Sequence, residues 1–420
     1  MIKLYLKQAW NLLRENKLVS GLSIGGTALS ICAVMLVVLM YQVTNGSYAP
    51  EVNRYRMMYI TASQTSSKDG GNVNRSHIST KVLNECLYPL SVPECVSGMA
   101  RDQVSLSLPK QRLFNKYKAI YTDDVFWKMF EFQFIEGQPF SATDFQSGIR
   151  AAVLSDKTAR RLFGSTSVIG KTFRLNSLEY TVCGVVKAVS TAAQNASADV
   201  WVPYTNVSTL NAGESVDEGC IGMFEALILA RSVSDFDAIR KEVDNKLAAF
   251  NASLSNVELS FLNCPYSQLE RMAGNNGFYG DNFPEWIKRT GGLVAFLLLL
   301  PALNIVGISL TQFRKRRTEI GLRKSFGAGS ATLLKQVLVE NLLISFIGGA
   351  IGLALAYVLL LACKPFLLLM NSELSITMLL RPETFIAAFL FTLLLNLLSA
   401  GIPAWRASRL PIVDALHDVE

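Results

Sequence analysis

The sequence is poor in charged residues and in histidine, and it lacks the short cysteine motifs that hold structural metals. Charged residues make up 17% of the 420 residues, and the only two histidines are His77 and His417. Its seven cysteines include no pair in the spacing Cys-x-x-Cys, so a structural zinc site is not expected. No Gly-x-Ser-x-Gly segment accompanies His77, which disfavours a hydrolase. The chain is therefore expected to hold no metal or cofactor and to have no catalytic machinery of its own.

Signals for nucleotide and nucleic-acid binding are also missing. Gly164, Gly170, Lys171 and Thr172 superficially fit a phosphate-binding loop, but that loop needs four residues between its glycines and this chain has five. The net charge is +7, yet the sequence has no basic tail and no RNA-binding aromatic motif. We expect neither a nucleotide site nor a nucleic-acid partner in this chain.

The most prominent feature of the sequence is a set of long apolar runs. Half of the residues are hydrophobic, and the mean hydropathy is +0.29. About 20 apolar residues suffice to cross a hydrocarbon core about 30 Å thick. Placing a lysine or arginine at mid-bilayer costs roughly 2.5–3.5 kcal/mol of insertion free energy, so each predicted span ends where such a residue occurs. The expected transmembrane helices are residues 18–41, 291–313, 333–363 and 384–403. The first run is too long for a signal peptide and lacks a clear cleavage site, so we expect it to stay as an anchor.

Basic residues beside these runs predict the orientation of the chain. They gather before the first run, between the second and third, and after the fourth: Lys3, Lys7, Arg14, Lys17, Arg314–Arg317, Arg323, Lys324, Arg406 and Arg409. The positive-inside rule places these flanks in the cytoplasm. The cytoplasmic parts are then 1–17, 314–332 and the tail 404–420, and 42–290 and the short loop 364–383 lie outside. Residues 1–17 form either an amphipathic helix in the interface or a continuation of the first span.

Residues 42–290 are too long for a loop and predict a globular α+β domain. We expect strands at 56–62, 151–154, 172–175, 180–186, 225–230 and 257–262, helices at 156–163 and 234–250, and loops at 64–76 and 190–199. The last strand–helix–strand series is a β-α-β pattern. Outside the cytoplasm Cys86 could pair with Cys95, and Cys220 with Cys264, but connectivity cannot be read from sequence.

The segment after the second run is the most informative. Residues 318–326 fit a short helix, Gly327-Ala328-Gly329 interrupts it, and Ser330 can cap the next helix. Such a helix at the membrane face is well placed to receive force from a cytoplasmic partner.

Three segments resemble one family. Residues 319–328 (EIGLRKSFGA), the tail 402–410 with 414–416, and 161–186 are similar to parts of MacB/FtsX/LolC-type ABC transporter permeases. The resemblance implies a membrane protein of the bacterial inner membrane. It would have four transmembrane α-helices and a large α+β periplasmic domain inserted between helices 1 and 2.

The same resemblance implies partners and a mechanism. Family members dimerise, as homodimer or heterodimer, and bind cytoplasmic ABC ATPase subunits that use ATP and Mg. The match makes Glu319, Arg323, Lys324, Gly327 and Ala328 candidates for the ATPase-coupling contact. The alternative is that they only anchor the helix at the lipid surface. MacB carries a fused ATPase domain that this sequence lacks, so a separate ATPase subunit is expected.

The resemblance leaves several functions open. Mechanotransmission could serve efflux of drugs, peptides or toxins, with a periplasmic adaptor or outer-membrane channel, or the extraction of lipoproteins. An FtsX-like regulator of an envelope enzyme is the alternative, and a receptor without any ATPase is disfavoured by the coupling motif. Two GxxxG pairs, Gly21 with Gly25 and Gly348 with Gly352, predict close helix packing, within one subunit or across a dimer.

Overall fold

The computed structural model describes residues 10, 14, 17–109, 115–207, 210, 217–273, 283–296, 299, 330–370, 383, 386–387, 389–391 and 393–394. The chain divides into two compact units. The first, which we call the helical unit, comprises Met1–Val43, Lys288–Met370 and Ser375–Glu420. The second, which we call the outer domain, comprises Thr44–Ile287 and Asn371–Leu374.

Two long helices form the described core of the helical unit, α2 (Lys17–Asn45) and α11 (Ser330–Met370). Each contains a window long and apolar enough to cross a membrane, Ser20–Val38 and Asn341–Leu359, with hydropathies of 2.1 and 2.3. These windows fall within the first and third predicted spans. The predicted spans 291–313 and 384–403 lie largely outside the described residues. α11 stays helical to Met370, so it extends into the segment 364–383 that we predicted as a loop.

The larger sheet of the outer domain is mixed. Its described strands run in the order β14-β1-β12-β4-β5-β10-β7-β9-β6, and β8 pairs with both β4 and β9. β5–β10 and β7–β9 are the parallel pairs, and the other pairs are antiparallel. The strands are β1 (Met57–Ile60), β4 (Cys95–Ser107), β5 (Asn115–Thr122), β6 (Phe134–Gly137), β7 (Ala151–Ser155), β8 (Thr172–Leu175), β9 (Leu178–Val186), β10 (Val200–Pro203), β12 (Glu225–Leu229) and β14 (Tyr266–Ser267).

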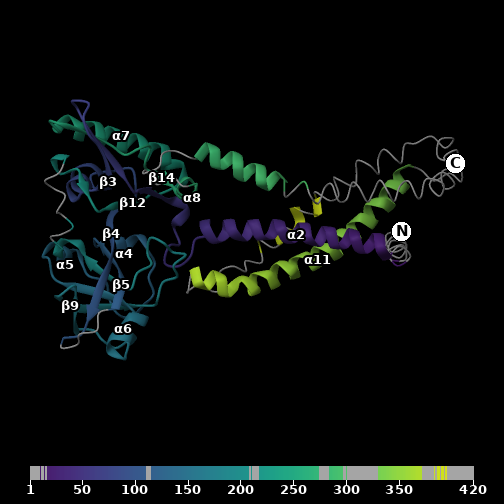
Figure 1. Ribbon diagram of the computed structural model, residues 1–420, viewed down its shortest axis with the longest axis horizontal. Coiled ribbons are helices and arrows are strands. Elements are labelled where there is room, and N and C mark those ends of the chain that lie inside the picture. Colours follow the sequence, from purple (N-terminus) through teal and green to yellow (C-terminus); the bar gives the residue numbers. More distant parts are fainter. Residues whose placement is uncertain are drawn as a thin grey trace. The chain divides into compact units, whose positions relative to one another are not determined.

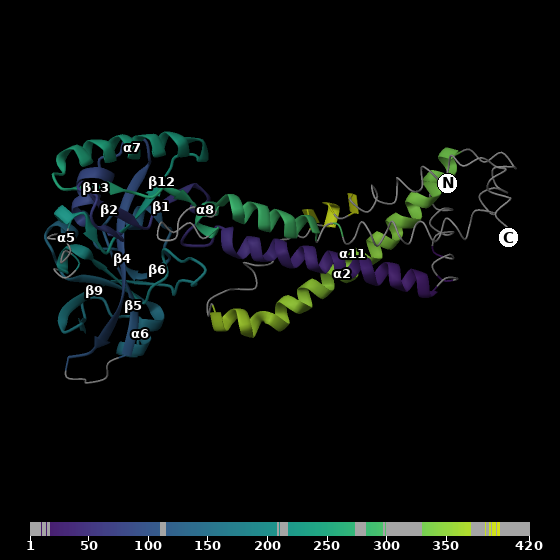
Figure 2. The ribbon, with the colours of Figure 1, turned by 45° about the horizontal axis from the view of Figure 1, so that its top comes forward.

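The smaller sheet is antiparallel, in the order β11-β3-β2-β13. Its strands are β2 (Ser63–Ser67), β3 (Val73–Ile78), β11 (Ile221–Gly222) and β13 (Val257–Ser260). The helices of the domain are α3 (Thr80–Val82), α4 (Phe126–Met129), α5 (Ala142–Gln146), α6 (Asp156–Phe163), α7 (Phe236–Ser253) and α8 (Gln268–Met272), with the π-helical turn η2 (Leu83–Leu87) and the 3-10 turns η1 (Arg54–Arg56), η3 (Tyr204–Asn206), η5 (Asp217–Gly219) and η6 (Val233–Asp235). α7 lies along β13 and η2 (Figures 1 and 2).

Most predicted elements of the outer domain are confirmed, with shifts of a few residues at their ends. β1, β7, β8, β9, β12 and β13 match the six predicted strands, α6 and α7 match the two helices, and 190–199 is a loop. The predicted loop 64–76 is wrong, because β2 and β3 pair there as a hairpin. The buried positions of β2 are Ser63 and Thr65, so the side chains that alternate toward the core are polar rather than hydrophobic. β12 and β13 belong to different sheets, so the β-α-β pattern is not a parallel pair.

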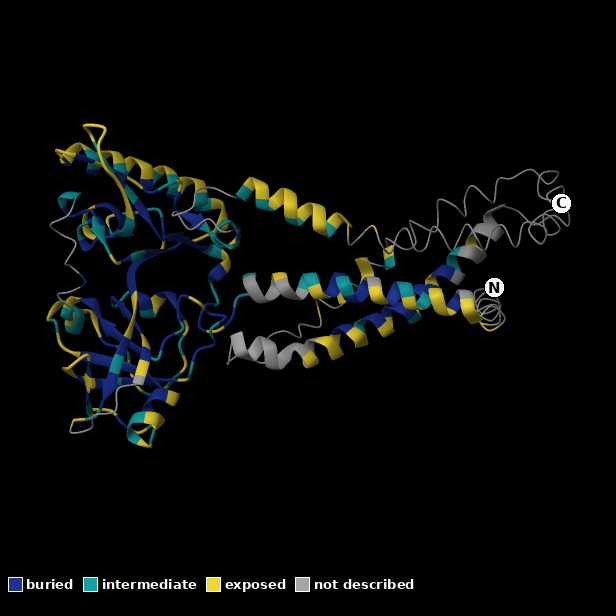
Figure 3. Ribbon diagram, in the orientation of Figure 1, coloured by how far each residue is buried: buried dark blue, intermediate teal, exposed yellow. Residues whose placement is uncertain are grey.

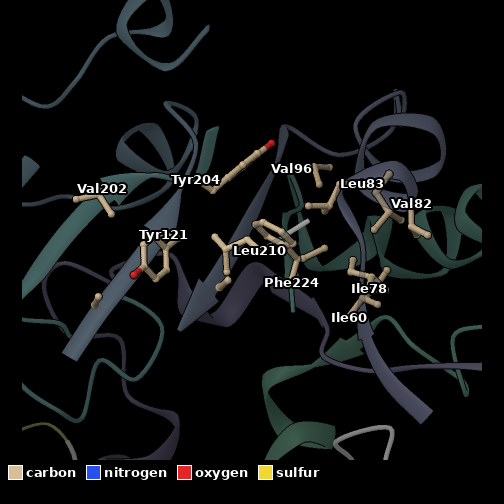
Figure 4. Packing of buried hydrophobic residues seen from close by; sticks show 14 of the residues in the cluster. Ile60, Ile78, Val82, Leu83, Val96, Tyr121, Val202, Tyr204, Leu210 and Phe224 are labelled. Atoms are coloured by element: carbon tan, nitrogen blue, oxygen red, sulfur yellow. The ribbon is translucent and has the colours of Figure 1, made fainter. Parts of the chain in front are cut away.

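The core consists of two clusters of buried apolar side chains. One joins the two sheets: Ile60, Ile78, Val82 and Phe224 lie together in it (Figure 4). The other surrounds Trp201 on β10. Figure 3 shows the strands buried, while the outward side of α7 is exposed. Burial in both sheets excludes water from the polar groups that lie between the strands.

The cysteines of the outer domain are free thiols, namely Cys86, Cys95, Cys183, Cys220 and Cys264. The pairs Cys86–Cys95 and Cys220–Cys264, left open by the sequence, are therefore not formed. Burial raises the pKa of Cys86 to about 12 and that of Cys220 to about 11. These thiols stay protonated at neutral pH, so they behave as apolar packing groups rather than nucleophiles.

Candidate functional site

The residues predicted to contact an ATPase lie outside the described part of the chain. They are Glu319, Arg323, Lys324, Gly327 and Ala328. The structure therefore gives no geometry for this contact, and the predicted helix over 318–326 stays a prediction. The four glycines of the GxxxG pairs all lie on α2 and α11.

Gly348 and Gly352 face α2 at close range. A Cβ added at Gly348 would lie 2.9 Å from Cβ of Thr27, and one at Gly352 would lie 2.6 Å from the main-chain oxygen of Ala28. No real side chain fits at these distances, so the two glycines let the helix backbones approach closely. This contact is made within one chain.

The first glycine pair is placed differently. Among the described residues, no atom lies within 4 Å of a Cβ built on Gly21 or Gly25. Further along the same helix, Ile31 and Met35 are buried together with Ala356 of α11. α11 also approaches Ile24 of α2, since a Cβ added at Gly348 would lie 3.1 Å from its main-chain oxygen, so this contact passes the first glycine pair without covering it.

A second candidate site lies in the outer domain, where the chain arrives from α2. Residues 46–56, which we call the incoming segment, contain a buried ion pair between Glu51 and Arg54. Arg54 Nε donates to Glu51 Oε2 at 2.7 Å, and the two side chains are only 2% and 0% exposed. Arg54 also donates to the main-chain oxygens of Gly46 (3.3 Å) and Ala192, and it lies over the Tyr48 ring. The ion pair thus binds the start of the incoming segment to the loop 190–198.

Glu51 is fully hydrogen-bonded on its second oxygen as well. Its Oε1 accepts from the main-chain N–H of Asn195 at 2.6 Å and of Ala196 at 3.0 Å. The Asn195 amide donates at 3.4 Å to Glu51 Oε2 and to the hydroxyl of Tyr59 on β1. Burial, with a smaller contribution from Glu51, raises the pKa of Tyr59, so its hydroxyl stays protonated. Both carboxylate oxygens of Glu51 therefore have hydrogen-bond donors inside the outer domain.

The chain leaves the domain through residues 267–273, which we call the outgoing segment, and this segment binds the same loop. Arg271 Nη1 on α8 donates to Asn195 Oδ1 at 2.6 Å. Its guanidinium lies 4.5 Å from the centroid of the Tyr59 ring, a cation–π contact. Arg271 Nη2 also lies 3.9 Å from Glu225 Oε2 on β12. Asn195 is therefore bonded to both the incoming and the outgoing segments.

A third contact fastens α8 to α7. Arg240 Nη2 donates to both carboxylate oxygens of Glu270, at 3.1 and 2.9 Å. Glu270 in turn closes a capping box with Ser267 at the start of α8. The first turn of α8 is thus fixed in direction by α7, while its last turn is fixed by the loop 190–198.

We call Glu51, Arg54, Tyr59, Asn195 and Arg271 the junction. It is composed of charges and amides that satisfy one another, and it leaves no side chain positioned as nucleophile or general base. Among the described residues, no group of three or more His, Cys, Asp and Glu is placed to hold a metal. The arrangement connects the incoming segment, the outgoing segment and β1 through their shared contacts with Asn195. Sequence reasoning missed it, and only the Glu51-x-x-Arg54 spacing gave a local sign.

Comparison with known proteins gives two matching families. The MacB-like periplasmic core domain matches residues 20–246, and the FtsX-like permease C-terminal domain matches residues 291–412. The junction residues up to Asn195 lie in the first match, while Arg271 lies between the two.

Curated relatives are larger than this chain. The macrolide export ATP-binding/permease protein MacB of Shewanella oneidensis is 26% identical over 308 residues, covering 69% of this chain and 42% of the relative. The protein of the same name from Vibrio parahaemolyticus is 23% identical over 426 residues, covering 98% of this chain and 59% of the relative. The chain thus spans about half the length of these relatives.

Two solved structures cover the outer domain at low similarity. The periplasmic region of MacB from Actinobacillus actinomycetemcomitans has a TM-score of 0.34 and 14% identity, covering 48% of this chain and 88% of that one. The extracellular domain of YknZ from Gram-positive bacteria has a TM-score of 0.33 and 18% identity, covering 43% of this chain and 88% of that one.

Proposed function

Because the chain belongs to the MacB/FtsX-type ABC transporter permeases, a family of membrane proteins with a large periplasmic domain, we propose that it works by mechanotransmission. ATP hydrolysis by a separate cytoplasmic ATPase would move the transmembrane helices, and these would move the outer domain. The chain itself would be non-catalytic, with ATP and Mg bound by its partner.

One observation carries the mechanical part of this proposal. The incoming and outgoing segments, which lie more than 200 residues apart in sequence, are both hydrogen-bonded to Asn195. A rigid, buried connection of this kind converts a movement of either segment into a movement of the whole sheet rather than into local bending. A domain that only tethered the chain would not need charged residues buried at this position, because burying them has a cost.

The topology proposed for this mechanism keeps four spans, with both termini in the cytoplasm. The permease would pair with a second permease subunit, identical or not, in the inner membrane. Glu319, Arg323, Lys324, Gly327 and Ala328 would form the contact with the ATPase, by the family resemblance of that segment. Gly21 and Gly25 are proposed as packing positions for the partner permease, since no described residue of this chain covers them.

The cargo is proposed by class. Relatives with matching domains are named for macrolide export, which supports efflux of drugs, peptides or toxins through a periplasmic adaptor or outer-membrane channel. Lipoprotein extraction uses the same motion and is kept as a second cargo class. An FtsX-like regulator of an envelope enzyme is the alternative function.

The test is a double charge reversal, Glu319→Arg with Arg323→Glu. We expect it to lower the permease-dependent stimulation of a copurified ATPase about tenfold, which corresponds to roughly 1.4 kcal/mol of lost coupling. The matched control reverses two exposed charges of the outer domain, Lys241→Glu with Glu258→Arg. It should leave the stimulation unchanged.

Two outcomes would overturn the proposal. One is full stimulation in the Glu319/Arg323 double variant together with normal amounts of folded protein. The other is ATP hydrolysis by the purified chain alone. Copurified proteins distinguish the alternatives, since an adaptor supports efflux, a lipoprotein supports extraction, and a cell-wall hydrolase supports the FtsX-like regulator.

A further inference from the structure

A groove with both charged and apolar surface in its walls runs beside the junction on the outer domain. It consists of two adjoining cavities of about 500 and 380 Å³, which share Lys118, Thr191 and Ser197 in their walls. Both volumes lie in the range of ligand-binding sites, about 300–1,000 Å³. The shared residues make the cavities one elongated groove, bounded on one side by the loop that carries Asn195.

The groove is rich in hydrogen-bond donors of positive charge. Arg101 and Lys118 line the first cavity, and Lys118, Lys157 and Arg161 line the second. All four side chains are exposed to solvent. Such a surface attracts anions, and cations of this kind form strong charge-assisted hydrogen bonds with carboxylates and phosphates.

The two carboxylates in the groove do not cancel this charge pattern. Asp102 accepts from the main-chain N–H of Gln103 at 2.7 Å, and Asp199 accepts from that of Lys118 at 2.8 Å. Each therefore has one oxygen engaged with the backbone. The four cations outnumber the two acids in the lining, and each cavity contains at least two of them.

Arg101 belongs to the groove and also touches the junction. Its Nη1 donates to Glu225 Oε1 at 2.8 Å, and its Nη2 lies 3.3 Å from Asn195 Oδ1. Asn195 Oδ1 is the same atom that accepts from Arg271. An anion bound in the groove would compete with Glu225 and Asn195 for the Arg101 guanidinium. Occupancy of the groove is thereby coupled to the residue that both segments share.

We propose that the groove binds an extended, carboxylate-rich peptide segment of a periplasmic protein. Binding of this peptide would change the contacts that Arg101 makes with Glu225 and with Asn195 of the junction. This inference rests on the proposed function, in which the outer domain acts on or with another protein. A peptide is favoured over a lone inorganic anion because the cations are spread along two joined cavities. An extended chain carries the side chains of alternate residues on one face, so a carboxylate-rich segment can present acids to both cavities at once.

Binding is tested on the full-length chain in detergent with a fluorescein-labelled hexaglutamate peptide, by fluorescence anisotropy. We expect binding that weakens with salt. The double variant Lys118→Glu with Arg161→Glu should weaken it at least about tenfold, which is 1.4 kcal/mol. The matched control is Lys241→Glu on the exposed side of α7, which should change the affinity less than about twofold. No binding, or equal losses in both variants, would overturn the proposal.

The source of the negative charge is tested by competition. Unlabelled hexaglutamate should displace the labelled peptide, and inorganic phosphate at an equal concentration of negative charge should not. Displacement by phosphate at equal concentration would overturn the peptide assignment, because it would show that a single anion satisfies the groove.

The coupling through Arg101 has a separate test, Glu225→Gln. This substitution keeps the size of the side chain but removes the charge that competes for Arg101, so we expect the peptide to bind several-fold more tightly. The control Glu258→Gln removes an exposed charge from β13 and should leave the affinity unchanged. Unchanged or weaker binding in Glu225→Gln would overturn the coupling. All these measurements omit the ATPase, so their failure is distinguishable from failure of the Glu319/Arg323 test.

Discussion

The two sheets of the outer domain are held by polar networks that differ in composition and in depth. On the larger sheet, Glu51 and Arg54 are 0% and 2% exposed, and they bind the incoming segment to the loop 190–198. On the smaller sheet, Asp217 accepts from Asn74 at 3.0 Å, and Glu218 accepts from the main-chain N–H of Ser255 at 2.9 Å. Both networks fasten a loop to a sheet through carboxylates.

How deeply each network is buried determines how much it contributes to the stability of the domain. Breaking a buried ion pair leaves an uncompensated charge away from water and costs about 3–5 kcal/mol. An exposed pair contributes about 0–1 kcal/mol, because water solvates either partner when the other is removed. The chain enters the outer domain before β1 and leaves it after β14, and both strands belong to the larger sheet. The comparison therefore predicts that the network on the larger sheet resists displacement and substitution more than the network on the smaller sheet does.

The largest effect is expected from Glu51→Ala. It removes the acceptor of Arg54 Nε and of two main-chain N–H groups while leaving the guanidinium buried. We expect the outer domain to lose about 3–5 kcal/mol of stability. Hydrogen exchange in the full-length protein should show the loss first in residues 46–60 and 190–198.

A compensating double variant sharpens this prediction. Glu51→Met with Arg54→Met removes both charges and keeps apolar volume, so it should recover much of the lost stability. Equal instability in the single and double variants would mean that shape, rather than the unpaired charge, determines the loss.

The next effect in size is expected from Arg271→Leu. It removes the 2.6 Å bond to Asn195 and the cation–π contact with Tyr59, at a cost of about 2 kcal/mol. Exchange protection should fall in α8 and in the loop 190–198, while the smaller sheet keeps its protection. Arg271→Lys retains the charge but not the fork of donors, so it should recover only part of the loss. A uniform loss of exchange protection across both sheets would contradict the difference between the two networks.

Local patterns in the sequence predicted much of the outer domain, and their failures have physical causes. β7 was found because it is a continuous apolar run ending at a helix cap, Ser155. β2 was missed because its buried positions hold Ser63 and Thr65, which bury polar groups against a partner strand that the sequence does not identify. Hydrophobic periodicity therefore detects strands whose burial is apolar.

The junction was missed for a different reason. Glu51 and Arg54 are three residues apart, but Asn195 lies 144 residues from Glu51 in the sequence. The loop 190–199 was correctly predicted as a loop, and nothing within it marks Asn195 as the shared partner. A pairing over such a separation is determined by the order of the strands, which one sequence does not give.

A smaller effect is expected from Arg240→Ala. This side chain is 33% exposed and joins α7, which packs on the smaller sheet, to Glu270 of α8. Its two bonds to one carboxylate are partly screened by water, so we expect a loss of about 1 kcal/mol. Thermal unfolding of Arg240→Ala, measured beside Lys241→Ala as the neighbouring control, checks this value. A loss as large as that of Glu51→Ala would show that the smaller sheet also bears the attachment.

The smallest effect is expected from Glu218→Gln. The main-chain N–H groups of Ser255 and Asn256 lower the pKa of Glu218 below its usual 4.5. A carboxylate with a depressed pKa stabilises the fold above its unfolded pKa, and this contribution is lost as the pH falls through the folded pKa. Because Glu218 is solvated, we expect Glu218→Gln to lower the stability at neutral pH only slightly and to flatten the acid side of the stability profile by the same small amount. If it destabilised the domain at neutral pH as much as Arg271→Leu, depth would not be what distinguishes the two networks, and the stiffness assigned to the larger sheet would lose its physical basis.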